Sequence, residues 1–346
     1  MAGRNAPFGA GFAQRNLADW QALVEKDLKG GDPERLVTTT EDGLRIPPLC
    51  TEGELLQVPP RADSAPERLA RIGAEGNGRV AAAIRYALDH GATGILLDLS
   101  TPRHSDGLAV EPADWDPIFG ELGDSGSLHL RANAGGIAHA RAWLESEAFG
   151  QRTGCSLGLD PFSVATLTGA FDDLTINLSG AAELGAEALN HRARPRPFVL
   201  DAAPYAAAGA TTAQAVGCLL SGTVEVLRAL EQASVDSSRA FDAIGWGLRL
   251  DPRFFEQIAA LRALRILHLQ VARACGVESP PALFLMALPA ERMLSRRDPW
   301  VNILRQTATC FSGLVGGADA VGAFAFDSTL QESSELGRRV ARNTPT

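Results

Sequence analysis

The sequence predicts an α/β protein built on a closed (β/α)8 barrel of the TIM type, preceded by an extended N-terminal arm. Three observations support this fold class. From about residue 79, short apolar runs alternate with helix-like segments. Most of these runs are continuously apolar, as expected of parallel strands buried on both faces. Eight such units in roughly 250 residues match a (β/α)8 barrel.

The predicted strands are short runs rich in Leu, Ile, Val and Phe. They occupy residues 94–100, 127–133, 154–160, 173–180, 196–203, 244–251, 282–288 and 320–327. Helical spacing predicts helices at 79–91, 112–122, 137–150, 211–233 and 252–276. The main alternative, a doubly wound sheet, lacks the glycine-rich dinucleotide turn that follows its first strand.

One further helix is predicted to begin within "RRDPWVNILRQT", residues 296–307. Asp298 is a suitable cap and Pro299 suits the first helical position. Apolar or small side chains then repeat at helical spacing, and we expect this stripe to face the sheet. The stripe consists of Trp300, Leu304, Thr307, Ala308, Phe311 and Val315.

Residues 1–78 form the predicted N-terminal segment, and residues 79–346 the barrel. The segment begins with an amphipathic helix at 16–30, followed by a turn and an extended arm at 38–51. Residues 58–78 are rich in proline and small side chains and are typical of a linker. Because an arm with Pro-Pro pairs cannot form a compact core alone, we expect it to lie across another surface.

Composition excludes several classes of protein. The chain has 346 residues and a net charge of −9, whereas nucleic-acid binders present a basic face. No run approaches the roughly 20 apolar residues of a membrane helix, and the N-terminus lacks a secretory signal. The cysteines are five in number and scattered, which predicts reduced thiols in a cytoplasmic protein. No histidines pair at metal-ligand spacing, so no metal site is predicted.

Candidate chemistry lies at the carboxyl ends of the predicted strands, where barrel enzymes place their catalytic groups. Four aspartates occupy such ends: Asp98, Asp160, Asp201 and Asp327. They could act as acids and bases or hold a metal, but each is more typical of a helix cap or a loop contact. His129 lies within a strand and could point into the barrel. His139 and His268 lie on helices, where packing is the usual role.

Tyr205 follows a strand end and is a candidate pocket residue, although an aromatic packed on the barrel rim is the more common case. The pentapeptide Gly-x-Ser-x-Gly occurs at residues 154–158, but it lies inside a predicted strand and not at the strand-to-helix turn of a nucleophile elbow, and no phosphate loop ending in Gly-Lys-Ser/Thr is present. These motifs therefore favour no particular reaction.

Several stretches together resemble the methylmalonyl-CoA mutase family, the adenosylcobalamin-dependent acyl-CoA mutases. The resembling stretches are "DWQALVEKDLKGGDPERLVTTTEDGLRIPPLCT", "AGATTAQAVGCLLSGTVEVLRA", "FFEQIAALRALRIL", "RRDPWVNILRQT", "LVGGADAVGAFAFD" and "RRVARNT". Their order and spacing carry the resemblance from about residue 16 to the end. It implies the same barrel fold and an N-terminal arm, with Cys50 where a tyrosine is common.

The resemblance also implies where substrate ligands would lie in a catalytic member. Catalytic chains carry Tyr-His where Ala203 and Pro204 stand, a glutamine at Gly158, and arginines near Thr168 and at Ala243. They carry histidines at Met286 and Gly322 and an asparagine at Phe324. Because a carboxylated acyl-CoA needs a cation and thioester donors, these replacements predict an apolar lumen that does not bind it.

The resemblance is therefore closest to the small (beta) subunit of a heterodimeric mutase, which keeps the fold without the active site. It implies a catalytic large subunit as the partner, acyl-CoA bound only in the complex, and adenosylcobalamin held by the partner chain. We expect no catalytic, cofactor-binding or metal residues in this chain. Two alternatives remain: a cobalamin-dependent mutase for another acyl group, and an unrelated barrel hydrolase or lyase using the strand-end aspartates.

Family members also carry a C-terminal cobalamin-binding domain with an Asp-x-His-x-x-Gly loop whose histidine ligates cobalt. No such loop occurs in these 346 residues. The resemblance places Thr346 inside the final barrel helix, so we expect that helix to be truncated. The chain would then be a fragment of a longer subunit, or the cobalamin domain would be carried elsewhere.

Overall fold

The structure is a computed structural model, and it divides into two units, Met1–Leu56 and Gln57–Thr346. It describes residues 11–13, 15–50, 57–61, 65–73, 80–99, 111–122, 126–132, 136–330 and 333–346. Parts of the predicted N-terminal segment and of the predicted linker fall between these ranges, and they lie outside the described residues. Each unit is considered by itself.

The N-terminal unit contains a helix, a short 3-10 turn and a small hairpin. Helix α1 (Leu17–Asp27) begins at a capping box in which Asn16 and Asp19 exchange hydrogen bonds. The turn η1 (Pro33–Leu36) leads into the hairpin of β1 (Thr38–Thr39) and β2 (Arg45–Ile46). No residue of α1 is buried. The unit therefore has little core of its own, as its sequence predicts.

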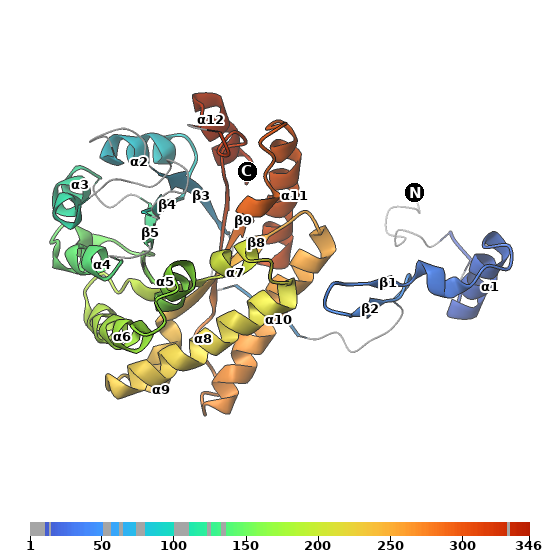
Figure 1. Cartoon of the computed structure of the whole chain (residues 1–346), viewed down its shortest axis with the longest axis horizontal. Helices are drawn as coiled ribbons and strands as arrows, with labels where there is room; N and C mark the ends of the chain where they lie inside the picture. Colours follow the sequence, from blue (N-terminus) through green and yellow to red (C-terminus); the bar gives the residue numbers. More distant parts are fainter. Residues whose placement is uncertain are drawn as a thin grey trace, which may run out of the picture. The chain divides into compact units, whose positions relative to one another are not determined.

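The second unit is a closed barrel of eight parallel strands (Figure 1). The strands are β3 (Glu67–Ile72), β4 (Gly94–Asp98), β5 (Ser127–Arg131), β6 (Ser156–Leu159), β7 (Arg196–Asp201), β8 (Ile244–Leu250), β9 (Phe284–Pro289) and β10 (Ala320–Ala323). Consecutive strands are neighbours, and β10 closes the barrel by pairing with β3. The predicted (β/α)8 fold is confirmed.

Helices surround the strands (Figure 1). They are α2 (Val80–Asp89), α3 (Trp115–Leu122), α4 (Gly136–Glu145), α5 (Pro161–Thr168), α6 (Leu174–Asn190), α7 (Ala203–Ala207), α8 (Thr212–Gln232), α9 (Ser237–Asp242), α10 (Phe254–Ala274), α11 (Val301–Gly316) and α12 (Glu335–Asn343). Short 3-10 turns are η2 (Pro112–Asp114), η3 (Phe149–Gln151) and η4 (Glu291–Met293). Alternate strand residues, such as Leu97, Leu128 and Trp246, bury against this helical layer.

Helix α8 has the length and mean hydropathy of a membrane span within the described residues. It packs against α6, α10 and β7 and buries a stripe that includes Leu219, Val226 and Leu230. Its apolar character therefore serves the barrel core.

The first barrel strand lies where the sequence predicts a linker. Residues 58–78 contain β3, which pairs with β4 on one side and with β10 on the other. Ala70 and Ile72 face the helical layer. The prediction failed because charged side chains at Glu67, Arg68 and Arg71 and the nearby prolines obscure the strand. The boundary of the barrel is thus earlier than residue 79.

The predicted strand at 173–180 is wrong, because these residues begin helix α6. The run continues into "AAELGAEALN", whose alanines and leucines favour a helix, and the helix buries residues at spacings of three and four. Ile176, which made the run strand-like, is 73% exposed. The structure therefore replaces this strand by β3 and still has eight.

The predicted orientation of the stripe on α11 is also wrong. Asp298 does accept a hydrogen bond from the Trp300 backbone N–H, but the apolar side chains point outward. We call these side chains the outer stripe, which consists of Trp300, Leu304, Phe311 and Val315. Leu304 is 72% exposed, and the buried face of α11 is instead polar and small. The exposed Phe255 of α10 extends the stripe, because Phe254 contacts both its ring and that of Phe311.

Candidate functional site

The barrel interior has three layers along its axis. At the N-terminal end, the His129 ring on β5 contacts Ser156 on β6 at 2.9 Å and Glu67 on β3 at 2.7 Å. Since β4 lies between β3 and β5, the contact to Glu67 passes over β4 at Gly94, where a Cβ atom would lie 2.6 Å from the Glu67 carboxylate. Burial raises the pKa of Glu67, but His129, Ser127 and Arg196 together outweigh burial and lower the pKa overall.

The middle layer is apolar. Its buried side chains form a cluster separate from the helical layer and are Leu69, Leu96, Met286, Leu288, Ala320 and Phe324. The layer fills the axis of the barrel, as in other (β/α)8 proteins. The lumen is therefore closed by packing in its centre.

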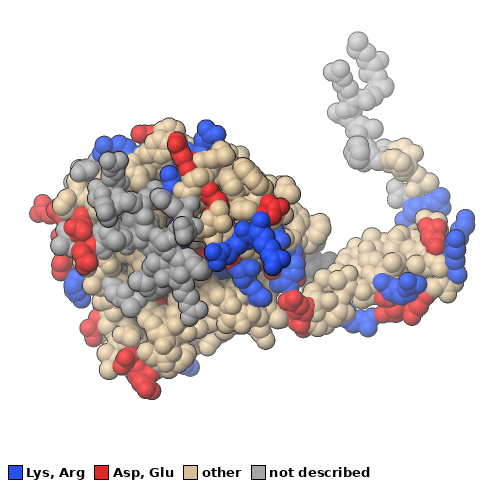
Figure 2. Space-filling model, turned by 45° about the horizontal axis from the view of Figure 1, so that its top comes forward, with Lys and Arg blue, Asp and Glu red and all other residues tan. Residues whose placement is uncertain are grey.

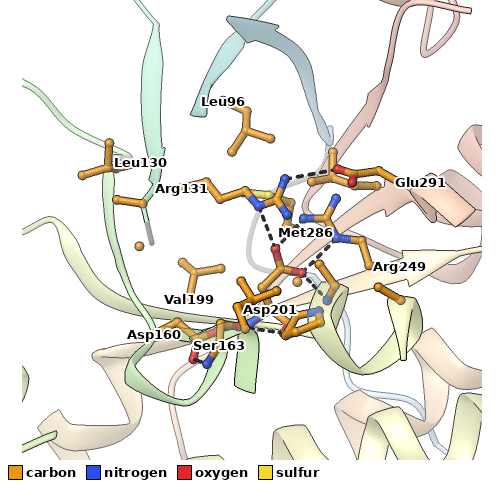
Figure 3. A pocket seen from close by; sticks show the side chains of 18 residues that line it. Leu96, Leu130, Arg131, Asp160, Ser163, Val199, Asp201, Arg249, Met286 and Glu291 are labelled. Carbon is orange, nitrogen blue, oxygen red and sulfur yellow. Dashed lines mark hydrogen bonds and ion pairs between the residues drawn. The ribbon is translucent and has the colours of Figure 1, made fainter. Parts of the chain in front are cut away.

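The C-terminal layer is charged, and it is built from arginines and aspartates at the ends of strands (Figure 3). Arg131 donates to Asp98 at 3.0 Å through Nη1 and lies 3.3 Å from Asp201 through Nε. Arg249 donates to both carboxylate oxygens of Asp201. Arg71 also donates to Asp98 at 2.9 Å. The network thus joins β3, β4, β5, β7 and β8.

Electrostatics hold this network in its charged state. Burial would raise the pKa of Asp201, but Arg249 and Arg131 outweigh burial and lower it. Burial raises the pKa of Asp160 to about 6, against the opposing hydrogen bonds from Ser163 and from the Asp201 backbone. Asp160 caps α5 through Ser163 N–H at 3.0 Å.

The structure brings three of the four strand-end aspartates together. Asp98 and Asp201 share Arg131, and Asp160 accepts the Asp201 backbone N–H at 2.8 Å. Asp327 lies apart and accepts the Ser334 N–H at the start of α12. The expected cap is confirmed at Asp160. At Asp98 and Asp201 the carboxylates are bound by arginine, which leaves them poorly suited to abstract a proton.

The candidate histidines and the tyrosine are placed as follows. His129 does point into the barrel, as predicted. His139 accepts a hydrogen bond from Trp115 Nε1 at 3.0 Å, and His268 is buried on α10. Tyr205 is half-buried on α7 and is not among the residues lining the barrel mouth. Within the described residues, no three His, Cys, Asp or Glu side chains gather as a metal site would require.

At Gly158 the backbone excludes any side chain. A Cβ atom there would lie 1.7 Å from the Leu130 carbonyl oxygen, and φ is +61°, a conformation that L side chains rarely adopt. The register of β6 against β7 shifts between Ser156 and Leu159. This strand therefore leaves no room for the glutamine that the family resemblance places here.

The other positions marked by the resemblance are similarly apolar or small. Ala203 and Pro204 line the barrel mouth, and Met286 and Phe324 belong to the middle layer. A Cβ at Gly322 would lie 3.0 Å from Leu288 and 3.1 Å from Leu69, so a histidine there would not fit without repacking. Thr168 ends α5 and donates to the Val164 carbonyl, and Ala243 is fully buried.

The predicted apolar lumen is wrong at the C-terminal mouth, because Arg131 and Arg249 point into the barrel there. Both sit at the ends of strands whose alternate residues are apolar, in "SLHLR" and "IGWGLRL". The sequence did contain a signal for these two arginines. Each lies near the end of a buried strand, two residues after a position that faces the lumen, so its side chain also faces the lumen. The lumen is apolar only in its middle layer.

Comparison with known proteins agrees with this geometry. The model of the methylmalonyl-CoA mutase family matches residues 188–346. A relative named methylmalonyl-CoA mutase small subunit, from Streptomyces virginiae, is 33% identical over 364 residues, covering 97% of this chain and 58% of the relative. The methylmalonyl-CoA mutase small subunit of Propionibacterium freudenreichii subsp. shermanii is 27% identical over 376 residues. This match covers 96% of this chain and 56% of that relative.

A shorter match, to the probable methylmalonyl-CoA mutase small subunit of Mycobacterium tuberculosis (strain ATCC 25618 / H37Rv), is 34% identical over 154 residues. It covers 43% of this chain and 25% of the relative. The chain spans a little over half the length of the first two relatives. Its similarity to them extends through the arm and the barrel, and the chain belongs to the methylmalonyl-CoA mutase family.

Proposed function

We propose that this chain is the small, non-catalytic subunit of a heterodimeric methylmalonyl-CoA mutase and stabilises a catalytic large subunit. The complex would interconvert methylmalonyl-CoA and succinyl-CoA. The observation that carries the non-catalytic assignment is the backbone at Gly158, where 1.7 Å to the Leu130 carbonyl leaves no space for a substrate-binding side chain. The relatives named small subunit support the rest.

The residues of the barrel mouth do not suit a bound acyl-CoA of this class. The Ala203 backbone N–H already donates to Asp201 at 2.9 Å, and Pro204 has no N–H to offer a thioester oxygen. The arginines of the mouth are held by Asp98 and Asp201, and they lie in a charged wall that offers no donor for a thioester oxygen beside Ala203 and Pro204. The missing thioester donor supports binding of acyl-CoA by the partner rather than by this chain.

Adenosylcobalamin would likewise be held by the partner chain. Of the histidines in the described part, His129 and His268 are buried inside the barrel and its helical layer, and His139 is bonded to Trp115. None of these three presents a free imidazole at the barrel mouth. The fit of these residues to a cobalt ion is poor, so no chemical step is assigned to this chain.

Two surfaces of this chain support a protein partner. The N-terminal unit exposes Leu23, Leu44 and other apolar side chains without a core of its own. On the barrel, the outer stripe of α11 continues into Phe255, which is 82% exposed. Contiguous exposed apolar side chains are typical of interfaces. We assign both surfaces to the large subunit.

Charged side chains of both signs are scattered over the face of the molecule in Figure 2, with one group of basic side chains on the barrel, and residues other than Lys, Arg, Asp and Glu cover much of the rest of the described surface. The five cysteines are free thiols, which suits a complex in the cytoplasm.

The two alternatives have less support. A mutase for another acyl group would still need a thioester donor near Ala203 and Pro204, where the one N–H is engaged. A hydrolase or lyase would need a free strand-end carboxylate, whereas Asp98 and Asp201 are bound by arginines.

The test is to express the chain alone and together with a mutase large subunit. We expect a stable complex on size-exclusion chromatography and methylmalonyl-CoA turnover with adenosylcobalamin by the complex only. Turnover by the isolated chain would refute the non-catalytic role. Failure to associate with the large subunit would refute the role as a partner.

A further inference from the structure

The C-terminal mouth of the barrel contains a cavity of about 120 Å³ with one charged and one apolar wall (Figure 3). The charged wall contains Arg131, Arg249, Asp201 and Glu291. The apolar wall is formed by Leu96, Leu130, Leu167, Val199, Met286 and Leu288. An engineered cavity of about 150 Å³ holds a benzene molecule, so there is room here for a ligand of a few heavy atoms.

Arg249 has an unused donor at this cavity. Its side chain is 2% exposed, and Nε and Nη2 both donate to Asp201. The remaining nitrogen, Nη1, is buried and has no hydrogen-bond partner among the described residues. In Figure 3 this nitrogen points away from Asp201, toward the side of the cavity where Glu291 lies. A buried guanidinium donor without a partner is costly and indicates a missing acceptor.

Glu291 forms a weak ion pair with Arg131 at the charged wall of this cavity, and another carboxylate could replace it. It lies in η4 after β9, its side chain is 56% exposed, and its carboxylate is 3.3 Å from Arg131 Nη1. That distance is at the long end for a hydrogen bond, and ion pairs with an exposed partner stabilise little. The side chain can move into water at low cost, which frees one donor of Arg131 beside the unused donor of Arg249.

We propose that this cavity binds a short aliphatic carboxylate. The ligand carboxylate replaces the Glu291 carboxylate beside Arg131 and also accepts a hydrogen bond from Arg249 Nη1, while its alkyl chain lies against the apolar wall. Because one carboxylate replaces another, the net charge of the mouth stays the same. Asp98 and Asp201 keep their arginine contacts. The inference does not depend on the proposed subunit role.

The chemistry of the walls distinguishes this ligand from other small molecules. Inorganic phosphate offers acceptors to the two arginines but has nothing to bury against Leu96, Met286 and Leu288. A neutral amide of the same shape fills the apolar wall but lacks the charge that strengthens hydrogen bonds from guanidinium groups. Both parts of the cavity are therefore needed for selectivity.

The experiment is calorimetric titration of the full chain with butyrate, butyramide and inorganic phosphate at constant ionic strength. We expect butyrate to bind at least about tenfold more tightly than either other compound. Equal binding of butyramide would overturn the carboxylate assignment. Equal binding of phosphate would overturn the role of the apolar wall.

Variants test the two arginine donors. Glu291→Gln removes the competing carboxylate from an exposed side chain, and we expect it to tighten butyrate binding by about threefold to tenfold. Arg249→Met should weaken binding by at least about tenfold. The control Arg228→Met, at an exposed arginine paired with Glu225, should leave binding unchanged.

Arg249→Met also breaks a buried ion pair and so needs a check of folding by circular dichroism. If Arg249→Met does not fold, the change in butyrate affinity of Glu291→Gln tests the proposal instead. Absence of butyrate binding by both the folded wild-type chain and the folded Glu291→Gln variant overturns the proposal.

Discussion

The inner and outer faces of helix α11 have the opposite polarity to an ordinary surface helix. The inner face of α11 buries Asn302, Gln306, Thr309 and Ser312, and its outer face exposes the outer stripe. The neighbouring α10 has a mainly apolar buried face, with Ile258, Leu261 and Leu264, although it also buries Gln257, Arg265 and His268. Elsewhere on the barrel, as on α8, the buried face is mainly apolar.

The largest buried polar side chains of the two helices, Asn302, Gln306 and Arg265, make hydrogen bonds to backbone atoms at and near the strand ends. The Asn302 side chain makes hydrogen bonds to Ser295 N and O and to the Phe326 carbonyl. Gln306 accepts the Phe324 N–H at 2.6 Å, and Arg265 donates to the Leu283 and Gly317 carbonyls. Burial of a polar group costs little when its hydrogen bonds are made. Polarity alone therefore does not identify the buried face of α11, and the apolar outer face is available to another protein.

The largest effect is expected at the outer face. Leu304→Asp places a charge in the centre of the outer stripe, and we expect it to weaken association with a large subunit by at least about 100-fold. The control is Ile176→Asp on α6, where the side chain is similarly exposed at 73% but stands outside the stripe. Analytical ultracentrifugation measures both. Equal weakening by the two variants would remove α11 from the interface.

At the inner face, Asn302→Leu should lower the free energy of unfolding by about 3 kcal/mol, because three hydrogen bonds are lost and buried backbone groups at Ser295 and Phe326 lose their partner. Thr307→Leu, on the exposed side of the same helix, should change it by less than about 0.5 kcal/mol. Urea denaturation compares the two. If Asn302→Leu left the free energy of unfolding unchanged, the hydrogen bonds of the polar inner face would not contribute to stability.

A pH-dependent effect is expected at His268, whose ring contacts Phe241 and Trp246 and whose Nε2 has no partner among the described residues. Burial lowers its pKa to about 4, from an ordinary 6.5. The unfolded chain then binds more protons than the folded chain between these values. The stability is therefore complete above pH 6.5 and decreases as the pH falls toward 4.

Relative to His268→Leu, the wild-type chain should lose about 3 kcal/mol of stability over that range, and chemical denaturation at a series of pH values measures it. His90→Leu, at an exposed histidine, is the control and should follow the wild-type curve. If His268→Leu has the same acid sensitivity as the wild type, the buried neutral imidazole is not its cause.

A smaller effect is expected where the two helices touch. Gly316 of α11 lies so close to Leu261 of α10 that a Cβ would be 2.5 Å from Leu261 Cδ1. Gly316→Ala should cost about 1–2 kcal/mol of unfolding free energy, since the leucine must shift. Gly217→Ala on α8, where a Cβ would meet nothing within 4 Å, should instead be neutral or stabilising. Thermal unfolding of both variants checks the contrast.

The fold was largely predictable because seven of its strands are short runs rich in apolar residues that alternate with helix-like segments, which reflects burial of the strands between the barrel axis and the helical layer. β3 escaped notice because its inward positions include Glu67 and Arg71, whose partners lie on other strands. The wrong strand at 173–180 was predicted because Ile176, a β-branched residue, lies in a short apolar run. In the structure it is an exposed isoleucine in the first turn of α6. Side-chain pairing between strands does not appear in the local sequence pattern.

The site was less predictable than the fold. The positions where substrate ligands are absent could be found by resemblance, but the arginine network at the mouth could not, because Arg131 and Arg249 meet only after the barrel closes. The outward direction of the stripe on α11 was hidden for a similar reason. Apolar spacing shows that a helix has two faces, and the partners of Asn302 and Gln306 decide which one turns inward.

The backbone at Gly158 has a consequence for how this chain could change over generations. A glutamine at this position is a single amino-acid change, yet its Cβ atom would lie 1.7 Å from the Leu130 carbonyl oxygen. The register of β6 would have to be reset at the same time. An intermediate with only one of the two changes would gain no substrate contact and would lose stability. A substrate-binding side chain at this strand would therefore require both changes together.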